Sequence, residues 1–274
     1  FEADIVRLSE DSFVYTLPAQ LESFQVTDEA SKIELLIPYL PPSTRKFTIS
    51  NELGLAKNLV IAQLLPLSLT ELNMNLRTEL LCSEWPLLPP NVSKLSFKAP
   101  SSRHTVSQTF DSDGVCREVT SIPFDTLPRS IKRLELVTKC INIYFCGPPA
   151  ISHRSYFPPQ LAYLSIPDIQ LHPETAKLLP SSLTHLEIGN LCEFVCEHLP
   201  KCLRTLISSR VWVSPNLFKS LPKSLTNLRL THLANGNWFD YNTAINATSI
   251  RNIPQYSIHV NSQSTDFNRD SAPL

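Results

Sequence analysis

The chain has 274 residues, a net charge of −1 from 24 basic and 25 acidic residues, and 23 prolines against five glycines. The balanced charge excludes the global basic field that supports non-specific nucleic-acid binding, so we expect no nucleic-acid partner. A membrane span is also excluded, because no apolar run reaches the roughly 18 residues that a spanning helix needs. The most apolar region, Leu53–Leu69, is interrupted by Lys57 and Pro66.

One pattern of ten residues recurs along most of the chain. Each copy opens with an apolar residue followed by proline, and three further positions at fixed offsets are apolar except at Thr44 and Ser208. The nine copies are Leu17–Val26, Leu40–Ile49, Leu65–Met74, Leu88–Phe97, Leu127–Leu136, Phe157–Ile166, Leu179–Ile188, Leu199–Ser208 and Leu221–Leu230. Most copies recur about every 20 to 25 residues, which predicts a solenoid in which neighbouring copies stack and none is stable alone.

Within one copy, Leu179–Ile188, the apolar residues Leu186 and Ile188 alternate with His185 and Glu187. This period of two predicts a half-buried strand. The proline near the start of each copy fixes an extended backbone and prevents a helix from running into the strand. We therefore expect nine parallel strands, spaced about 4.8 Å apart, whose apolar side chains form continuous columns.

The repeat pattern also divides the chain into regions. Residues 1–16 precede the first copy and are expected to cap the open edge of the first strand. Residues 17–240 are expected to form the solenoid. Residues 241–274 are expected to form a closing cap and flexible tail, in which Tyr256, Ile258 and Val260 alternate as in a last edge strand.

The segments between copies are mostly returns of about ten to fifteen residues, too short for a long helix with two turns. We expect extended, 3₁₀ or short helical returns, with short helices over Glu174–Leu178 and Leu217–Ser220. Two returns, Lys98–Thr126 and Val137–Tyr156, are oversized. They are either tolerated surface insertions or adjacent loops that form a recognition surface, and the first has room for a degenerate tenth copy.

The strand pattern resembles the leucine-rich repeat, Leu-x-x-Leu-x-Leu, seen as Leu183-x-x-Leu186-x-Ile188 and again from Leu225 to Leu230. The Leu-Pro-x-x-Leu opening is most similar to FNIP-type repeats and to the short repeats of secreted bacterial effectors. This resemblance implies a leucine-rich repeat solenoid with a curved parallel sheet on the concave side and short irregular, 3₁₀ or helical returns on the convex side. It also implies a concave face that binds a partner, usually another protein.

One position departs from the usual leucine-rich repeat, which carries Asn or Cys three residues after the last strand leucine. Here that position holds Glu29, Glu52, Arg77, Pro100, Lys139, Ile169, Leu191, Val211 and Leu233. The asparagine ladder of the family is therefore missing. Because the last four copies are apolar at this position, we expect them to pack more tightly than the first five, whose turns should be more exposed to solvent.

Two columns of side chains are expected to point out of the sheet. The first is Ser23, Lys46, Glu71, Lys94, Arg133, Tyr163, His185, Thr205 and Asn227, and the second is Gln25, Thr48, Asn73, Ser96, Glu135, Ser165, Glu187, Ile207 and Arg229. The candidate partner-binding residues lie near the middle, beside the oversized returns, and are Lys94, Lys98, Arg133, Glu135, Tyr163 and His185. Arginine and aromatic side chains are favoured binding anchors. A solvated sheet face of mixed charge is an equally weighted alternative.

A metal site is weakly suggested by Cys192, Cys196, His198 and Cys202. We expect none, because the spacing is not the paired C-x₂-C arrangement and cysteine is common at buried positions.

The seven cysteines are scattered without a disulfide framework, which favours a cytoplasmic or otherwise intracellular location. Two glycosylation sequons, at Asn91 and Asn246, argue the other way. A bridge between Cys140 and Cys146 is the less favoured alternative to two free thiols.

No catalytic arrangement is recognised. The seven histidines are spread along the chain, and the sequence has no G-x-S-x-G motif, no H-E-x-x-H motif and no glycine-rich phosphate loop. Asp111–Gly114 resembles the start of a calcium loop but lacks the downstream Glu, since Ile122 occupies its place, which favours a polar turn.

The sequence therefore predicts a protein-binding module that is not an enzyme and needs no cofactor. The alternatives are the substrate-recognition part of a larger enzyme complex, such as a ubiquitin ligase or a secreted effector, and a metal or redox site at Cys192–Cys202.

Overall fold

The structure is a computed structural model of the whole chain. It describes residues 2–4, 17–26, 36–53, 64–76, 88–99, 127–138, 157–171, 173–212, 214, 216–234 and 255–258. Most of the two oversized returns, the segment 235–254 and the tail after Ile258 lie outside these described residues, and so do Asp111–Gly114, Cys140, Cys146 and Asn246.

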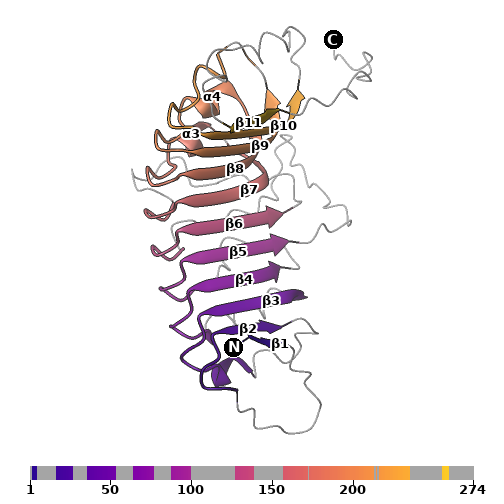
Figure 1. Cartoon of the computed structure of the whole chain (residues 1–274), viewed down its shortest axis with the longest axis vertical. Helices are drawn as coiled ribbons and strands as arrows, with labels where there is room; N and C mark the ends of the chain where they lie inside the picture. The colour runs from indigo at the N-terminus through magenta and orange to yellow at the C-terminus, as the bar shows by residue number, and fades with distance from the viewer. Residues whose placement is uncertain are drawn as a thin grey trace, which may run out of the picture.

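The described strands form one parallel sheet of eleven strands in chain order (Figure 1). They are β1 (Glu2–Asp4), β2 (Ser23–Val26), β3 (Lys46–Leu53), β4 (Glu71–Leu76), β5 (Lys94–Ala99), β6 (Arg133–Thr138), β7 (Tyr163–Gln170), β8 (His185–Leu191), β9 (Thr205–Trp212), β10 (Asn227–Ala234) and β11 (Gln255–Ile258). The nine predicted copies supply β2 to β10. Strand β1 pairs with β2 at one end, and β11, where the sequence predicted an edge strand, pairs with β10 at the other.

Each copy begins with a tight turn that the proline starts. The backbone N–H of the fifth residue donates to the carbonyl of that proline, from Leu21 to Pro18 in the first copy through Leu225 to Pro222 in the ninth, at 2.9 to 3.1 Å. This is the hydrogen bond of a β-turn. Proline lacks a donor but keeps its carbonyl, so it can close the turn and still block a helix. The predicted corner is present in all nine copies.

Between neighbouring copies, the fourth residue of the turn forms a polar ladder that the sequence analysis missed. The Ser182 hydroxyl, for example, donates to the carbonyls of Pro159 and Leu161 in the preceding copy, at 2.9 and 2.8 Å. We call this set the turn ladder: Ser43, Ser68, Asn91, Ser130, Ser182, Cys202 and Ser224. It pairs turn carbonyls at the start of the strands, whereas the family's asparagine ladder lies at their end.

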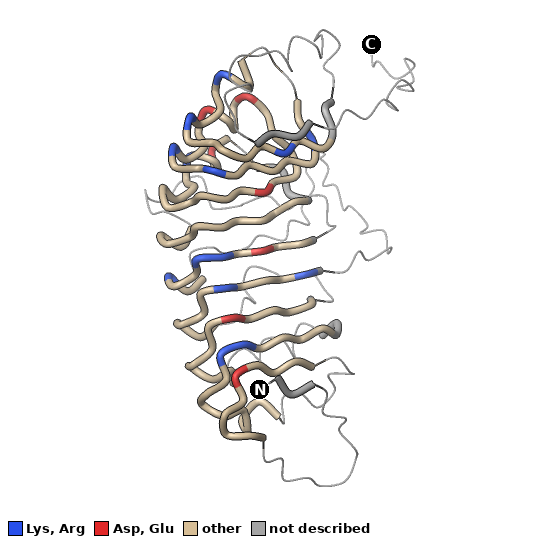
Figure 2. The backbone as a smooth tube through the Cα atoms, viewed as in Figure 1, with Lys and Arg blue, Asp and Glu red and all other residues tan. Residues whose placement is uncertain are grey.

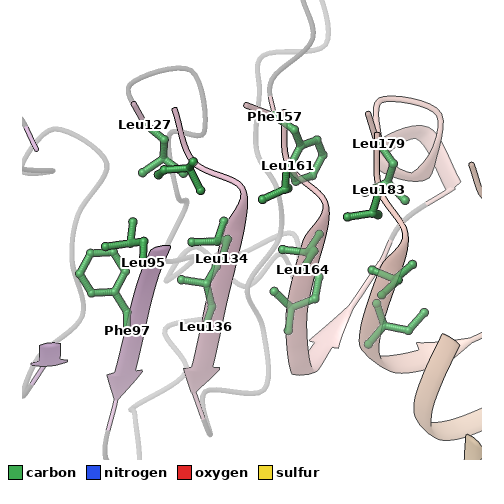
Figure 3. Packing of buried hydrophobic residues seen from close by; sticks show 14 of the residues in the cluster. Leu95, Phe97, Leu127, Leu134, Leu136, Phe157, Leu161, Leu164, Leu179 and Leu183 are labelled. Carbon is green, nitrogen blue, oxygen red and sulfur yellow. The ribbon is translucent and has the colours of Figure 1, made fainter. Parts of the chain in front are cut away.

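The interior is built from apolar columns that run from strand to strand. Leu95, Leu134 and Leu164 are register partners on β5, β6 and β7, and all three are at most 1% exposed (Figure 3). Burying a leucine fully contributes about 1.5 to 3 kcal/mol. The two polar exceptions are buried but paired: the Thr44 hydroxyl donates to the Leu21 carbonyl at 3.2 Å and the Ser208 hydroxyl to the Arg210 carbonyl at 2.8 Å.

The last copies pack further residues behind the sheet. Leu191 and Val211, at the position where the family carries Asn or Cys, are fully buried, and the tighter packing expected of the last four copies relative to the first five stays a prediction. Short returns are also confirmed: η2 (Ile37–Tyr39) is a 3₁₀ turn, and α3 (Pro173–Ala176) and α4 (Glu193–Cys196) are single helical turns.

The short helix predicted over Leu217–Ser220 is wrong. This stretch is a turn, closed by the Ser220 N–H donating to the Asn216 carbonyl at 3.0 Å. The strand-opening Leu221–Pro222 follows directly, and a residue before proline is disfavoured in the helical region, so the turn does not continue into a helix.

Candidate functional site

The strand register places the two predicted outer columns as expected. In the first column Lys46, Glu71, Lys94, Arg133, Tyr163, His185, Thr205 and Asn227 are successive pairing partners on β3 to β10. In the second column Glu135, Ser165, Glu187, Ile207 and Arg229 are aligned in the same way on β6 to β10. The register shifts on β3 and β7 lie beyond Ile49 and Ile166, so the backbones of neighbouring column residues are about one strand spacing, 4.8 Å, apart.

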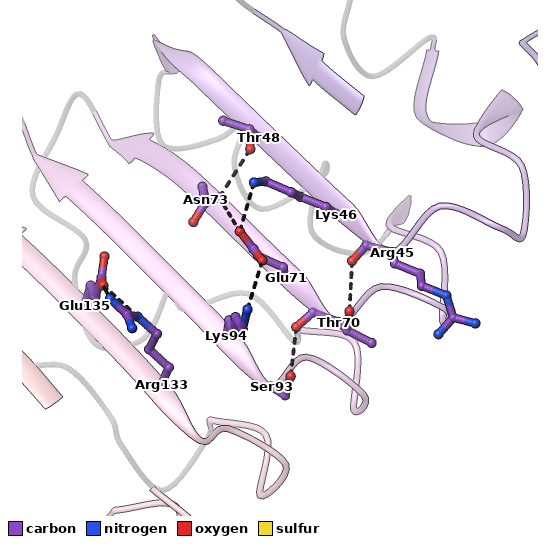
Figure 4. Close-up of polar contacts among 10 residues, drawn as sticks. All are labelled: Arg45, Lys46, Thr48, Thr70, Glu71, Asn73, Ser93, Lys94, Arg133 and Glu135. Atoms are coloured by element: carbon purple, nitrogen blue, oxygen red, sulfur yellow. Dashed lines mark hydrogen bonds and ion pairs between the residues drawn. The ribbon is translucent and has the colours of Figure 1, made fainter. Parts of the chain in front are cut away.

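The end of the first column nearest β3 is an ion-pair network (Figure 4). Glu71 lies between two lysines, with its carboxylate 3.2 Å from Lys46 Nζ and 3.6 Å from Lys94 Nζ. The Asn73 amide donates to Glu71 and to the Thr48 hydroxyl, both at 3.3 Å. Partial burial alone would raise the pKa of Glu71, but the Asn73 hydrogen bond and the two lysines lower it below its usual value. Glu71 therefore stays ionised and compensates part of the positive charge of the two lysines.

The middle of the first column is a stack of three side chains on adjacent strands. The Arg133 guanidinium lies 3.8 Å from the centre of the Tyr163 ring, a cation–π contact. On the other side of Tyr163 the His185 ring stacks at 4.1 Å between centroids, with an angle of 10° between the planes. Glu135 accepts a hydrogen bond from Arg133 Nε at 2.8 Å. The guanidinium is thus held in place while the Arg133 side chain stays 46% exposed.

His185 is the most constrained member of the Arg133–Tyr163–His185 stack. Its Nε2 atom is buried and has no hydrogen-bond partner among the described residues. Burial lowers the pKa of His185 and Arg133 acts in the same direction, against the raising effects of Glu187 and Glu135. Burial likewise raises the pKa of Tyr163, so both rings are uncharged at neutral pH.

Four of the six predicted site residues, Arg133, Glu135, Tyr163 and His185, come together in and beside the stack. Lys94 lies next to Arg133 in the register but pairs with Glu71 instead. Lys98 is exposed further along β5, beside Val137 of β6.

Sequence reasoning left two neighbours out of the candidate site. Glu187, on β8, accepts a hydrogen bond from the Ser165 hydroxyl of β7 at 2.7 Å. Both residues were placed in the second outer column, but a hydrogen bond between strands gives no local sequence signal.

The suggested metal ligands do not gather. Cys196 is buried in the core, which raises its pKa and keeps the thiol protonated. Cys202 belongs to the turn ladder, with its Sγ 3.1 Å from the Leu183 carbonyl. In the part of the chain that the structure describes, no three His, Cys, Asp or Glu side chains are arranged to hold a metal ion. The described helices also include none that is long and apolar enough to cross a membrane.

The recurring Leu-x-x-Leu-x-Leu strands, their single parallel sheet and the short returns define a leucine-rich repeat solenoid. This confirms the predicted fold class.

No protein-family model matches the chain, and no curated protein sequence matches it. Among solved structures the chain is similar to an internalin from Listeria monocytogenes, with a TM-score of 0.39 and 14% sequence identity, over 88% of this chain and 74% of that one. The FNIP-type assignment, the exact domain boundaries and the intracellular location stay predictions.

Proposed function

We propose that this chain is a protein-binding module that recognises its partner through the exposed, concave face of the sheet, centred on the Arg133–Tyr163–His185 stack. Arginine and tyrosine are among the residues that contribute most to binding energy at protein interfaces. Arg133 is held by Glu135 on one side and by the Tyr163 ring on the other. Side chains that are already ordered lose little conformational entropy on binding, so more of their contact energy appears as affinity.

The observation that carries this proposal is the stack itself. Elsewhere in the first column, Lys46, Glu71 and Lys94 satisfy one another through ion pairs. The stack also contains an ion pair, Arg133 with Glu135, but it differs in presenting two uncharged rings beside a guanidinium whose side chain is 46% exposed. A partner that contributes a carboxylate and an apolar or aromatic surface would complete it. The oversized returns that follow β5 and β6 in the sequence are proposed to add to this surface.

The experiment is affinity capture with the immobilised chain, followed by affinity measurement with the purified partner. Arg133→Ala combined with Tyr163→Ala is expected to weaken binding by about thirtyfold or more, the effect of a hot spot worth about 2 kcal/mol. The matched control is Lys46→Ala with Glu71→Ala, because these residues also touch each other on adjacent strands of the same column. An equal loss of affinity in both double variants, or no loss in either, would show that the stack is not part of the interface.

A further inference from the structure

The last two copies differ in charge from the rest of the chain. From Leu199 to Phe239 the sequence contains no Asp or Glu but six cations, which are Lys201, Arg204, Arg210, Lys219, Lys223 and Arg229. The whole chain has a net charge of −1, so the remainder is clearly acidic. Positive charge is therefore concentrated at one end of the solenoid.

All six of these cations are exposed, and none of them makes an ion pair with any described residue. This contrasts with Lys46 and Lys94, which share Glu71, and with Arg133, which pairs with Glu135. The repeat itself does not require Lys201, Arg204 and Lys223, because other copies have Pro or Ala at the third position and Thr or Ala at the sixth.

Four of the cations lie in the eighth and ninth copies, which supply β9 and β10. Lys201 and Lys223 are the third residues of successive turns, so their backbones are about one strand spacing, 4.8 Å, apart. Arg204 precedes β9, and its carbonyl accepts the Thr226 and Asn227 N–H groups of the next copy at 2.9 Å. On the sheet face Arg229 pairs in register with Ile207. Figure 2 shows Lys and Arg recurring along the turn edge near β9 and β10.

Like charges on adjacent strands repel each other and lower stability. A cluster with no acidic neighbour within its own copies is therefore a net cost to the free protein. That cost is removed when a bound molecule supplies the negative charge.

We propose that this basic edge, formed by Lys201, Arg204, Lys223 and Arg229 around Ile207, docks an acidic segment of a protein partner that also carries an apolar side chain. The proposal rests on the proposed protein-binding function but not on the Arg133–Tyr163–His185 stack.

Two features favour a protein segment over a nucleic acid. Ile207 provides an apolar contact in the middle of the charges. Its neighbour in the second column is Glu187 on β8. Glu187 would repel a phosphate backbone that continued along the sheet. A surface only two strands wide suits a short acidic segment better than a long polyanion.

The test uses the full chain and a labelled peptide of about eight residues that alternates Glu with Leu, long enough at about 3.3 Å per residue to cross both copies. Replacing Lys201, Arg204 and Lys223 together by Glu is expected to weaken binding by about tenfold or more. The matched control replaces Arg45, Arg129 and Lys132 by Glu, since these exposed residues occupy the third or sixth positions of other copies and change the net charge equally. Circular dichroism and thermal unfolding check that both variants are folded.

The site is supported if only the variant at Lys201, Arg204 and Lys223 loses affinity for the peptide and if Ile207→Ser also weakens binding. It is supported further if a peptide with Gln in place of each Glu does not bind. Equal losses in the two charge variants would show general electrostatic attraction and overturn the site. Tighter binding to a single-stranded oligonucleotide, or to phosphatidylcholine vesicles that contain phosphatidylserine, would overturn the choice of a protein segment.

The stack and the basic edge can fail separately. If Arg133→Ala with Tyr163→Ala abolishes capture of the natural partner while the peptide does not bind, the proposed function stands and this inference fails. If the peptide binds and only the basic-edge variant loses it, the inference stands whatever the role of the stack.

Discussion

Two regions of the solenoid, β3 to β5 and β8 to β10, are built from the same repeat but are stabilised in different ways. In the first, outward charges pair across strands, as Lys46, Glu71 and Lys94 do. In the second, Leu191 on β8 and Val211 on β9 are fully buried at the position where the family carries Asn or Cys, and the exposed Arg210 and Arg229 make no ion pair with any described residue. The same repeat thus accommodates outward charges that pair across strands in one region, and in the other region cations without an ion-pair partner among the described residues.

The largest expected effect tests the additional core packing. Leu191→Ala is expected to lower the free energy of unfolding by about 2 to 5 kcal/mol, because it removes a fully buried side chain and leaves a cavity. Glu52→Ala, at the same repeat position of the second copy, whose turn the sequence predicts to be exposed to solvent, should change it by less than about 0.5 kcal/mol. Urea unfolding of both variants makes the measurement. Similar losses in the two would mean that the regions do not differ in this way.

An intermediate effect concerns pH and the stack that lies between the two regions. Because the pKa of His185 is lowered in the folded state, the unfolded chain binds its proton first as the pH falls. The contribution of the neutral His185 ring to the free energy of unfolding is complete above pH 6.5, the ordinary pKa of histidine. It is lost as the pH falls from there through the lower pKa of the folded state. Unfolding free energies between about pH 7 and 5 are expected to fall less for His185→Phe than for the natural chain. Identical pH profiles would exclude this role.

The smallest effect compares the charges of the two regions directly. Glu71→Gln is expected to cost about 0.2 to 1 kcal/mol at low salt, because both lysine pairs are partly exposed. Arg229→Gln should leave stability unchanged or raise it slightly, because it relieves repulsion in the basic edge. Thermal unfolding at low and high salt distinguishes the two variants, since salt should reduce the loss of stability caused by Glu71→Gln. A loss of stability in Arg229→Gln would show that this arginine has a structural partner.

Much of this architecture was predictable because its signals are local. The proline of each copy and the alternation of residues such as Leu186 and Ile188 predict the nine strands and both outer columns. The turn ladder was not predicted, because a serine such as Ser182 has the sequence signature of an ordinary turn and its acceptors lie in the preceding copy. The order of contacts along a column, including the Tyr163–His185 stacking, likewise depends on neighbouring copies.

The sequence predicts which residues form the centre of the candidate site better than it predicts where the site ends. Arg133 and Tyr163 were chosen because of their chemistry, and the register brought them into contact. Lys94 was predicted as part of the same site, yet it pairs with Glu71 on β4. The excess of Lys and Arg in the last two copies was not predicted, because it is a difference in charge between copies and gives no signal within a column.

The turn ladder has a consequence for how such a chain can evolve. Ser182 donates backwards to the preceding copy, and in turn the carbonyls of Ser181 and Leu183 are partners for Cys202 of the following one. A whole internal unit thus brings along both its own donor and its own acceptors. Gain or loss of one such unit in the gene would leave the turn-ladder bond of the new junction intact wherever the following copy carries its donor, so the length of the protein can change in steps without redesign of its interior.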